Sequence, residues 1–71
     1  MRTQTTFDAW LTYALETHYM SRAIRQNESG DYAAVEARDA ESRRLWHLCR
    51  LDGWKYEEGE QALRAALAEN E

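Results

Sequence analysis

The 71-residue chain contains no proline and only three glycines, and its β-branched residues number one Val, one Ile and five Thr. Proline and glycine interrupt helices, whereas β-branched residues favour strands. Their scarcity therefore argues against a β-rich fold and against long loops. Ala, Leu, Glu and Arg, which are good helix formers, make up much of the chain instead. The composition predicts an all-α protein in which residues 1–71 form a single helical domain.

The chain also has little of the chemistry that enzymes and metal sites need. Cys49 is the single cysteine, so no disulfide can form within the chain, and with two histidines a Cys/His zinc site would lack ligands. His47 and Cys49 are two positions apart, which places their side chains about 200° apart around a helix. They cannot share one metal ion or one reaction, and no third group or oxyanion site is marked. We therefore predict no enzymatic activity, no metal and no cofactor.

Long hydrophobic runs are absent as well. No apolar stretch approaches the roughly 20 residues of a membrane span, and the polar amino terminus lacks a signal-peptide pattern. A single cysteine fits a reducing compartment. We expect a cytoplasmic protein without membrane contact.

The shortness of the chain limits its core. A domain of this size buries only about 60% of its unfolded surface, and small domains usually need a disulfide, a metal or a partner chain for stability. Because the first two are excluded, helix packing and oligomerisation remain. We expect a homodimer.

Helix signals divide the chain into three segments, at about residues 6–27, 31–51 and 56–69. Thr5 or Thr6 is a candidate N-cap for the first, with Asp8 in its first turn. Asp31 is the candidate for the second. Ser29-Gly30-Asp31 and Asp52-Gly53 are turn signals, and short connections favour antiparallel neighbours. The expected fold is a small three-helix bundle, or an antiparallel helical hairpin with a short third helix.

The first helix has an unusually wide apolar face, which covers more than half of its circumference. A helix with one neighbour needs a stripe of only about 100°. This helix is either central in its own bundle or shared with a second chain, and in so short a chain we favour the second. The expected self-association residues are Trp10, Tyr13, Tyr19, Met20 and Ile24.

The other two helices have narrower apolar stripes. In the second helix the expected inward residues are Ala34, Ala37, Glu41, Leu45 and Leu48. In the third helix they are Tyr56, Leu63, Ala66 and Leu67.

Charge is banded along the chain, whose net charge is −4. Acidic residues exceed basic ones in 28–41 and in 57–71, whereas basic residues prevail in 42–56. Two of the three tryptophans also fall in the basic segment. Basic and aromatic residues together are typical of protein hot spots and of nucleic-acid interfaces. The candidate partner-binding residues are Arg43, Arg44, Trp46, His47, Arg50, Trp54, Lys55 and Tyr56. An alternative is that Trp46 and Trp54 simply brace the corner between the second and third helices.

These features favour a small non-enzymatic protein-binding regulator, adaptor or inhibitor. Its size suits the compact effectors that phages and mobile elements direct against host proteins, which is an analogy of class alone. The alternative is a small dimeric nucleic-acid-binding regulator that uses the basic 43–55 segment, although the overall acidity opposes phosphate binding. A further alternative is that the acidic segments mimic a nucleic-acid backbone.

Overall fold

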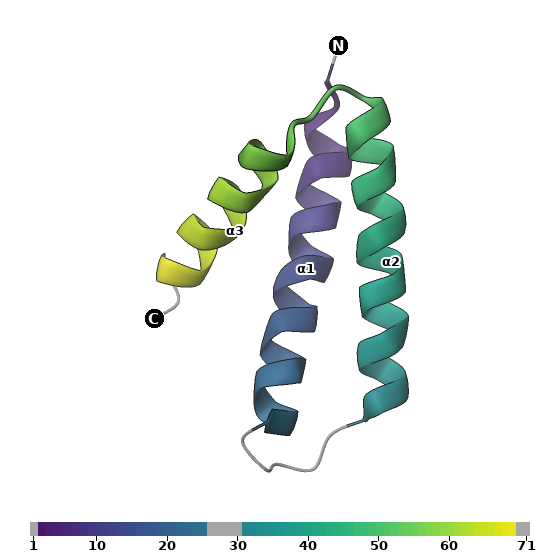
Figure 1. The fold of residues 1–71 in the computed structure, drawn as a ribbon, viewed down its shortest axis with the longest axis vertical. Coiled ribbons are helices and arrows are strands. Elements are labelled where there is room, and N and C mark those ends of the chain that lie inside the picture. The colour runs from purple at the N-terminus through teal and green to yellow at the C-terminus, as the bar shows by residue number, and fades with distance from the viewer. Residues whose placement is uncertain (1, 26–30, 70–71) are drawn as a thin grey trace.

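The computed structural model of the chain describes residues 2–25 and 31–69. They form three helices, α1 (Gln4–Arg25), α2 (Tyr32–Leu51) and α3 (Tyr56–Glu69), and no strand. α1 and α2 run antiparallel as a hairpin, and α3 packs against the opposite side of α1 (Figure 1). The prediction of an all-α, three-helix fold is confirmed. Residues 26 and 27 of the first expected helix lie outside the described residues, as do Ser29 and Gly30 of the first turn signal.

The start of α1 differs from the prediction. The helix begins at Gln4, so Thr5 and Thr6 lie inside it and cap nothing, and its first turn contains no acidic residue. The carbonyl of Thr3 instead accepts a hydrogen bond from the backbone of Phe7 at 3.3 Å, and the amide of Thr3 donates to the Asp52 carboxylate. Because Asp52 lies far along the chain, the start of this helix is held by a tertiary contact that local capping signals do not reveal.

The two ends of α2 follow the predicted signals. At the N-cap, Oδ1 of Asp31 accepts from the backbone of Ala34 at 3.2 Å. After the last turn, Gly53 adopts a φ of 100°, a conformation that side-chain-bearing residues avoid. The amide of Gly53 then bonds the carbonyl of Arg50 at 3.1 Å, and that of Trp54 bonds the carbonyl of Cys49 at 3.0 Å. This is the Schellman pattern of helix termination, and it turns the chain toward α3.

The apolar core lies at the end of the hairpin that is next to this turn. It consists of Phe7, Trp10, Leu45 and Cys49, all at most 9% exposed. Phe7 and Trp10 come from α1 and are large, whereas two of the α2 residues that pack opposite them, Cys49 and the buried Ser42, are small. Large side chains on one helix need small ones on its neighbour.

This size matching corrects the predicted inward face of α2. Leu45 is buried as expected, but Leu48 is 40% exposed and Ala37 is exposed. The buried stripe passes through Ser42, Leu45 and Cys49. It has the same spacing of three and four as the predicted stripe, and differs from it by about one position. The aromatic residues on α1 select between the two stripes.

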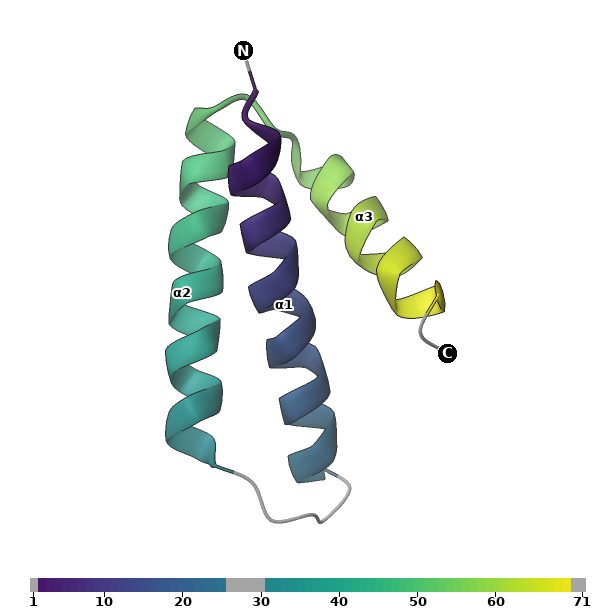
Figure 2. The same ribbon diagram turned by 180° about the vertical axis from the view of Figure 1, so that it is seen from behind.

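The three helices form a broad, thin molecule, with extents of 42 × 25 × 16 Å. α1 lies between its two neighbours, and α3 diverges from it toward the carboxyl end (Figures 1 and 2). The wide apolar face of α1 thus has two neighbours within one chain, so α1 is central in its own bundle. Here the structure supports the alternative that we did not favour from the sequence.

Candidate functional site

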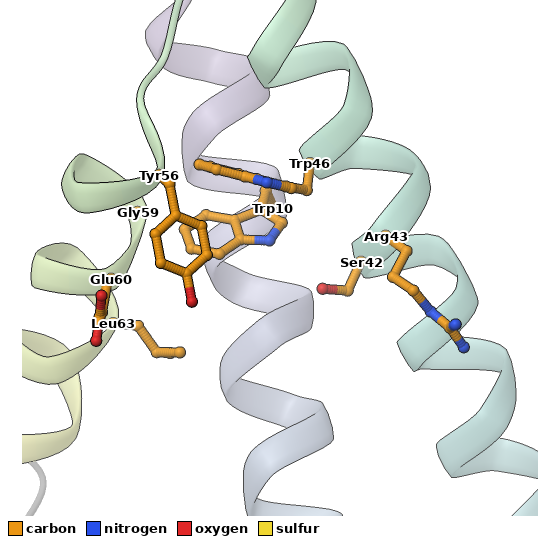
Figure 3. A pocket seen from close by; sticks show the side chains of 8 residues that line it. All are labelled: Trp10, Ser42, Arg43, Trp46, Tyr56, Gly59, Glu60 and Leu63. Carbon is orange, nitrogen blue, oxygen red and sulfur yellow. The ribbon is translucent and has the colours of Figure 1, made fainter.

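A groove opens between α2 and α3, with α1 beneath it, as Figure 3 shows. Its volume is about 220 Å³. All three helices contribute to its walls. The lining residues are Trp10, Ser42, Arg43, Trp46, Tyr56, Gly59, Glu60 and Leu63.

Two tryptophans form the deep end of this groove. The rings of Trp10 and Trp46 lie 4.8 Å apart between centroids and are tilted by 43°. α3 reaches them through Gly59, which is buried although it has no side chain. A Cβ atom at position 59 would lie 2.7 Å from Cη2 of Trp46 and 3.1 Å from Cη2 of Trp10. The close approach of α3 to the hairpin therefore depends on glycine at this position.

The open end of the groove presents apolar and aromatic surface. Tyr56 projects from the start of α3 over the groove, as Figure 3 shows, and is 64% exposed. The half-buried Leu63 points into it from about two turns further along α3. Such surface is what protein interfaces bury at their centres.

The charged residues at the rim are paired outside the groove. Arg43 forms an ion pair with Asp39 at 2.6 Å, and its side chain is directed away from the aromatic rings in Figure 3. Glu60 pairs with Arg64 at 2.6 Å. The interior is mostly apolar, although the small polar residue Ser42 also lines it, and charges of both signs lie at its edge.

Trp54 has a different role, because it braces the α2–α3 corner. Its ring stacks on Phe7 with a centroid distance of 4.0 Å and an interplanar angle of 23°. The guanidinium of Arg2 lies over the same ring, 4.3 Å from its centroid, and Arg50 donates to the carbonyl of Trp54 at 3.2 Å. The indole Nε1 is buried without a hydrogen-bond partner in the described structure.

The structure thus divides the predicted partner-binding residues into groups. Arg43, Trp46 and Tyr56 line the groove, whereas Arg50 and Trp54 belong to the corner. Arg44 is bound to Glu41, and this hydrogen bond holds the pKa of the Glu41 carboxyl below its usual value. His47 and Lys55 are exposed. Trp46 and Trp54 are both half-buried and pack against the core.

Five groove residues were not among the predicted partner-binding residues: Trp10, Ser42, Gly59, Glu60 and Leu63. They come from three separate segments, so no local pattern unites them. One signal was available in Gly59, because an isolated glycine inside a helical pattern often marks a close packing contact.

The expected self-association residues lie along α1 but are not equally accessible. Trp10 is 9% exposed and already covered within the chain. Tyr13, Tyr19, Met20 and Ile24 are half-buried, and the hydroxyl of Tyr19 is buried without a partner among the described residues.

The candidates for metal or nucleophile chemistry are separated. Cys49 is fully buried, and burial raises the pKa of its thiol, whereas His47 is exposed. Within the described residues, no three His, Cys, Asp or Glu side chains gather where they could bind a metal ion. None of the described helices has the length and apolar character needed to cross a membrane.

Comparisons of the chain with protein-family models, with curated proteins and with solved structures found no match.

Proposed function

We propose that this chain is a non-enzymatic protein-binding module, a small regulator, adaptor or inhibitor. It receives an apolar side chain of its partner in the groove between α2 and α3. The observation that supports this is the open aromatic groove itself, in which Trp10 and Trp46 form the floor and the exposed Tyr56 forms a wall. Aromatic side chains of this kind are common as anchors in protein interfaces.

The size of the groove favours a protein partner over a cofactor. Sites for small molecules usually enclose about 300–1,000 Å³, and this groove has about 220 Å³. It can hold one or two side chains of a partner. The oppositely charged rim residues Arg43 and Glu60 would meet the partner's polar groups around that anchor. We place this activity in the cytoplasm, since a lone, buried thiol suits a reducing compartment.

Tyr56→Ala tests the groove, with Tyr32→Ala as its matched control. The two tyrosines are 64% and 68% exposed, and Tyr32 lies at the start of α2, outside the groove. Each variant and the wild type serve as bait in extracts of the source cells, and the retained protein is then purified for affinity measurement. We expect Tyr56→Ala to weaken binding by about 30-fold, as loss of a hot spot of about 2 kcal/mol does. Equal affinities for both variants would contradict the proposal.

The nucleic-acid alternative has less support. The segment proposed to bind nucleic acid has four cationic residues. Two of them, Arg43 and Arg44, are ion-paired, and Arg50 donates a hydrogen bond to the carbonyl of Trp54. Its test is binding to random duplex DNA at low salt. If it holds, affinity should fall steeply with added salt and with Arg43→Glu plus Lys55→Glu, because phosphate contacts release counterions.

A further inference from the structure

A second surface, on the side of α2 away from its buried stripe of Ser42, Leu45 and Cys49, is exposed. Leu48 and Leu51 are 40% and 73% exposed there. Four further exposed positions recur at a spacing of three or four residues and so share that face. The stripe consists of Ala33, Ala37, Ala40, Arg44, Leu48 and Leu51. In both views of the molecule α2 forms an outer edge, so a helix can approach it there (Figures 1 and 2).

This stripe is complementary to itself in size. Its amino-terminal half contains only alanines, and its carboxyl-terminal half contains the three large residues. If a second copy of α2 lies antiparallel, with the two-fold axis near residue 42, Leu51 faces Ala33 of the other copy. In the same register Leu48 faces Ala37, and Arg44 faces Ala40. Each large side chain then meets a small one, as close helix packing requires.

The same arrangement is complementary in charge. Residues 31–41 contain four carboxylates and one arginine, a net charge of −3, and residues 42–51 contain three arginines and no carboxylate, a net charge of +3. An antiparallel pair places the acidic half of each helix beside the basic half of the other, whereas a parallel pair would place like charges together. Charge pattern of this kind sets orientation in paired helices.

We propose that two copies of this chain associate through α2, antiparallel and related by a two-fold axis near residue 42. Symmetry favours a second copy of this chain as the partner, because a two-fold interface requires one surface to complement itself. The stripe does so in size, and the net charges of the two halves of α2 do so about the same point. α2 spans about 30 Å, and α1 and α3 lie outside the contact. The aromatic groove stays open in this dimer, so a failure of the dimer proposal would leave the proposed partner binding in the groove untouched, and the reverse also holds.

Sedimentation equilibrium at micromolar concentration is the first test. The wild type should sediment at twice the 8.4 kDa mass of the chain. Leu48→Glu with Leu51→Glu should raise the dimer dissociation constant at least about 30-fold, since it places charge against the alanines that face these positions toward both ends of the contact. Tyr32→Glu is the control, because Tyr32 is equally exposed but lies off the stripe, and it should leave the dimer unchanged. A monomeric wild type, or a double variant that dimerises normally, overturns the proposal.

Cross-linking then tests the orientation. Cys49 is buried, so single cysteines at positions 33 and 51 can report contacts between copies. A mixture of Ala33→Cys and Leu51→Cys should oxidise to the mixed disulfide. Each variant alone should not cross-link, because its two cysteines would lie about 27 Å apart along the helices, beyond the reach of about 7 Å. Cross-linking of Ala33→Cys with itself would indicate a parallel pair. If the mixture formed no mixed disulfide, the proposed contact through α2 would be wrong.

Discussion

At the scale of single residues, Gly59 has the largest influence on the groove. It is in the middle of α3's first two turns, where glycine weakens a helix by about 1 kcal/mol relative to alanine. It is also buried against Trp10 and Trp46, and a Cβ atom there would lie only 2.8 Å from Cζ3 of Trp46. Helix propensity and packing therefore favour different residues at this position, and the short distance indicates that packing is the larger effect.

We expect Gly59→Ala to lower the free energy of unfolding by about 1–3 kcal/mol, the usual cost of overpacking a core. Urea denaturation followed by tryptophan fluorescence measures the change. Ala65→Gly, at an exposed position of the same helix, is the control for propensity and should cost about 1 kcal/mol. If Gly59→Ala instead stabilises the protein, Trp46 can move aside at little cost.

A double variant separates the clash from other effects. Trp46→Phe removes the ring atoms that the new methyl group would meet. Gly59→Ala combined with Trp46→Phe should therefore be more stable than the sum of the two single changes indicates. Neighbours in contact couple in this way by about 0.5–3 kcal/mol, and strict additivity would mean that the two residues do not interact.

At the scale of elements, the start of α3 is only half capped. Glu58, the third residue of the helix, accepts a hydrogen bond from the amide of Lys55 at 2.9 Å, which is one half of a capping box. The other half needs a short hydroxyl or carboxylate side chain at position 55, and lysine has none. The helix thus begins with an unused stabilising contact.

Lys55→Ser should complete the capping box and raise the free energy of unfolding by about 0.5–1 kcal/mol. Thermal unfolding by circular dichroism measures the gain. Lys55→Ala removes the same charge without supplying a hydroxyl, so it should show no such increase. If the two variants were equally stable, removal of the lysine charge, and not the new hydroxyl, would explain any change in the free energy of unfolding.

The same contact makes stability depend on pH. The amide of Lys55 and the guanidinium of Arg2 hold the pKa of Glu58 below its usual value of 4.5. The folded state favours the ionised carboxylate, so this contribution is complete above pH 4.5 and is lost as the pH falls through the lower folded-state pKa. Glu58→Gln should therefore lower the melting temperature near neutral pH, with the difference vanishing in acid. Glu57→Gln is the control for loss of one carboxylate from the same turn.

Helix limits were more predictable from the sequence than helix faces. Asp31 and Gly53 act on their own neighbours, so local signals located both ends of α2. The face of α2 depends on what α1 presents, and two stripes of the same spacing were available. The groove joins residues such as Trp10 and Gly59 from distant segments, and its shape follows from the path of α3, which no periodicity encodes.

At the scale of the whole molecule, packing is uneven along the hairpin. Every buried residue of α1 and α2 lies between Phe7 and Trp10 or between Ser42 and Cys49. The described parts of α1 and α2 nearer to their connection, residues 14–25 and 31–41, contain none. α3 contributes Gly59 alone to the buried set. Stability should therefore decrease away from the α2–α3 corner.

Amide hydrogen exchange at the residue level measures this gradient. We expect the slowest exchange at residues 7–14 and 42–49, and faster exchange at 18–25, 32–38 and 63–69, because these last segments open without disrupting the core. Uniform protection along α1 and α2 would show that the hairpin opens only as one unit. Gly59→Ala should accelerate exchange in α3 more than in the hairpin.

The contacts of residues 2 and 3 with the α2–α3 corner bear on the order of events during synthesis. Thr3 binds Asp52 and Arg2 binds Glu58, at sequence separations of 49 and 56 residues. Residues 2 and 3 leave the ribosome before residues 52–58, so their binding site exists only after those later residues have followed and turned back. α1 therefore emerges with its first turn unanchored, and contacts between such distant residues are slow to form. We therefore expect residues 2 and 3 to pack onto the α2–α3 corner after that corner has formed.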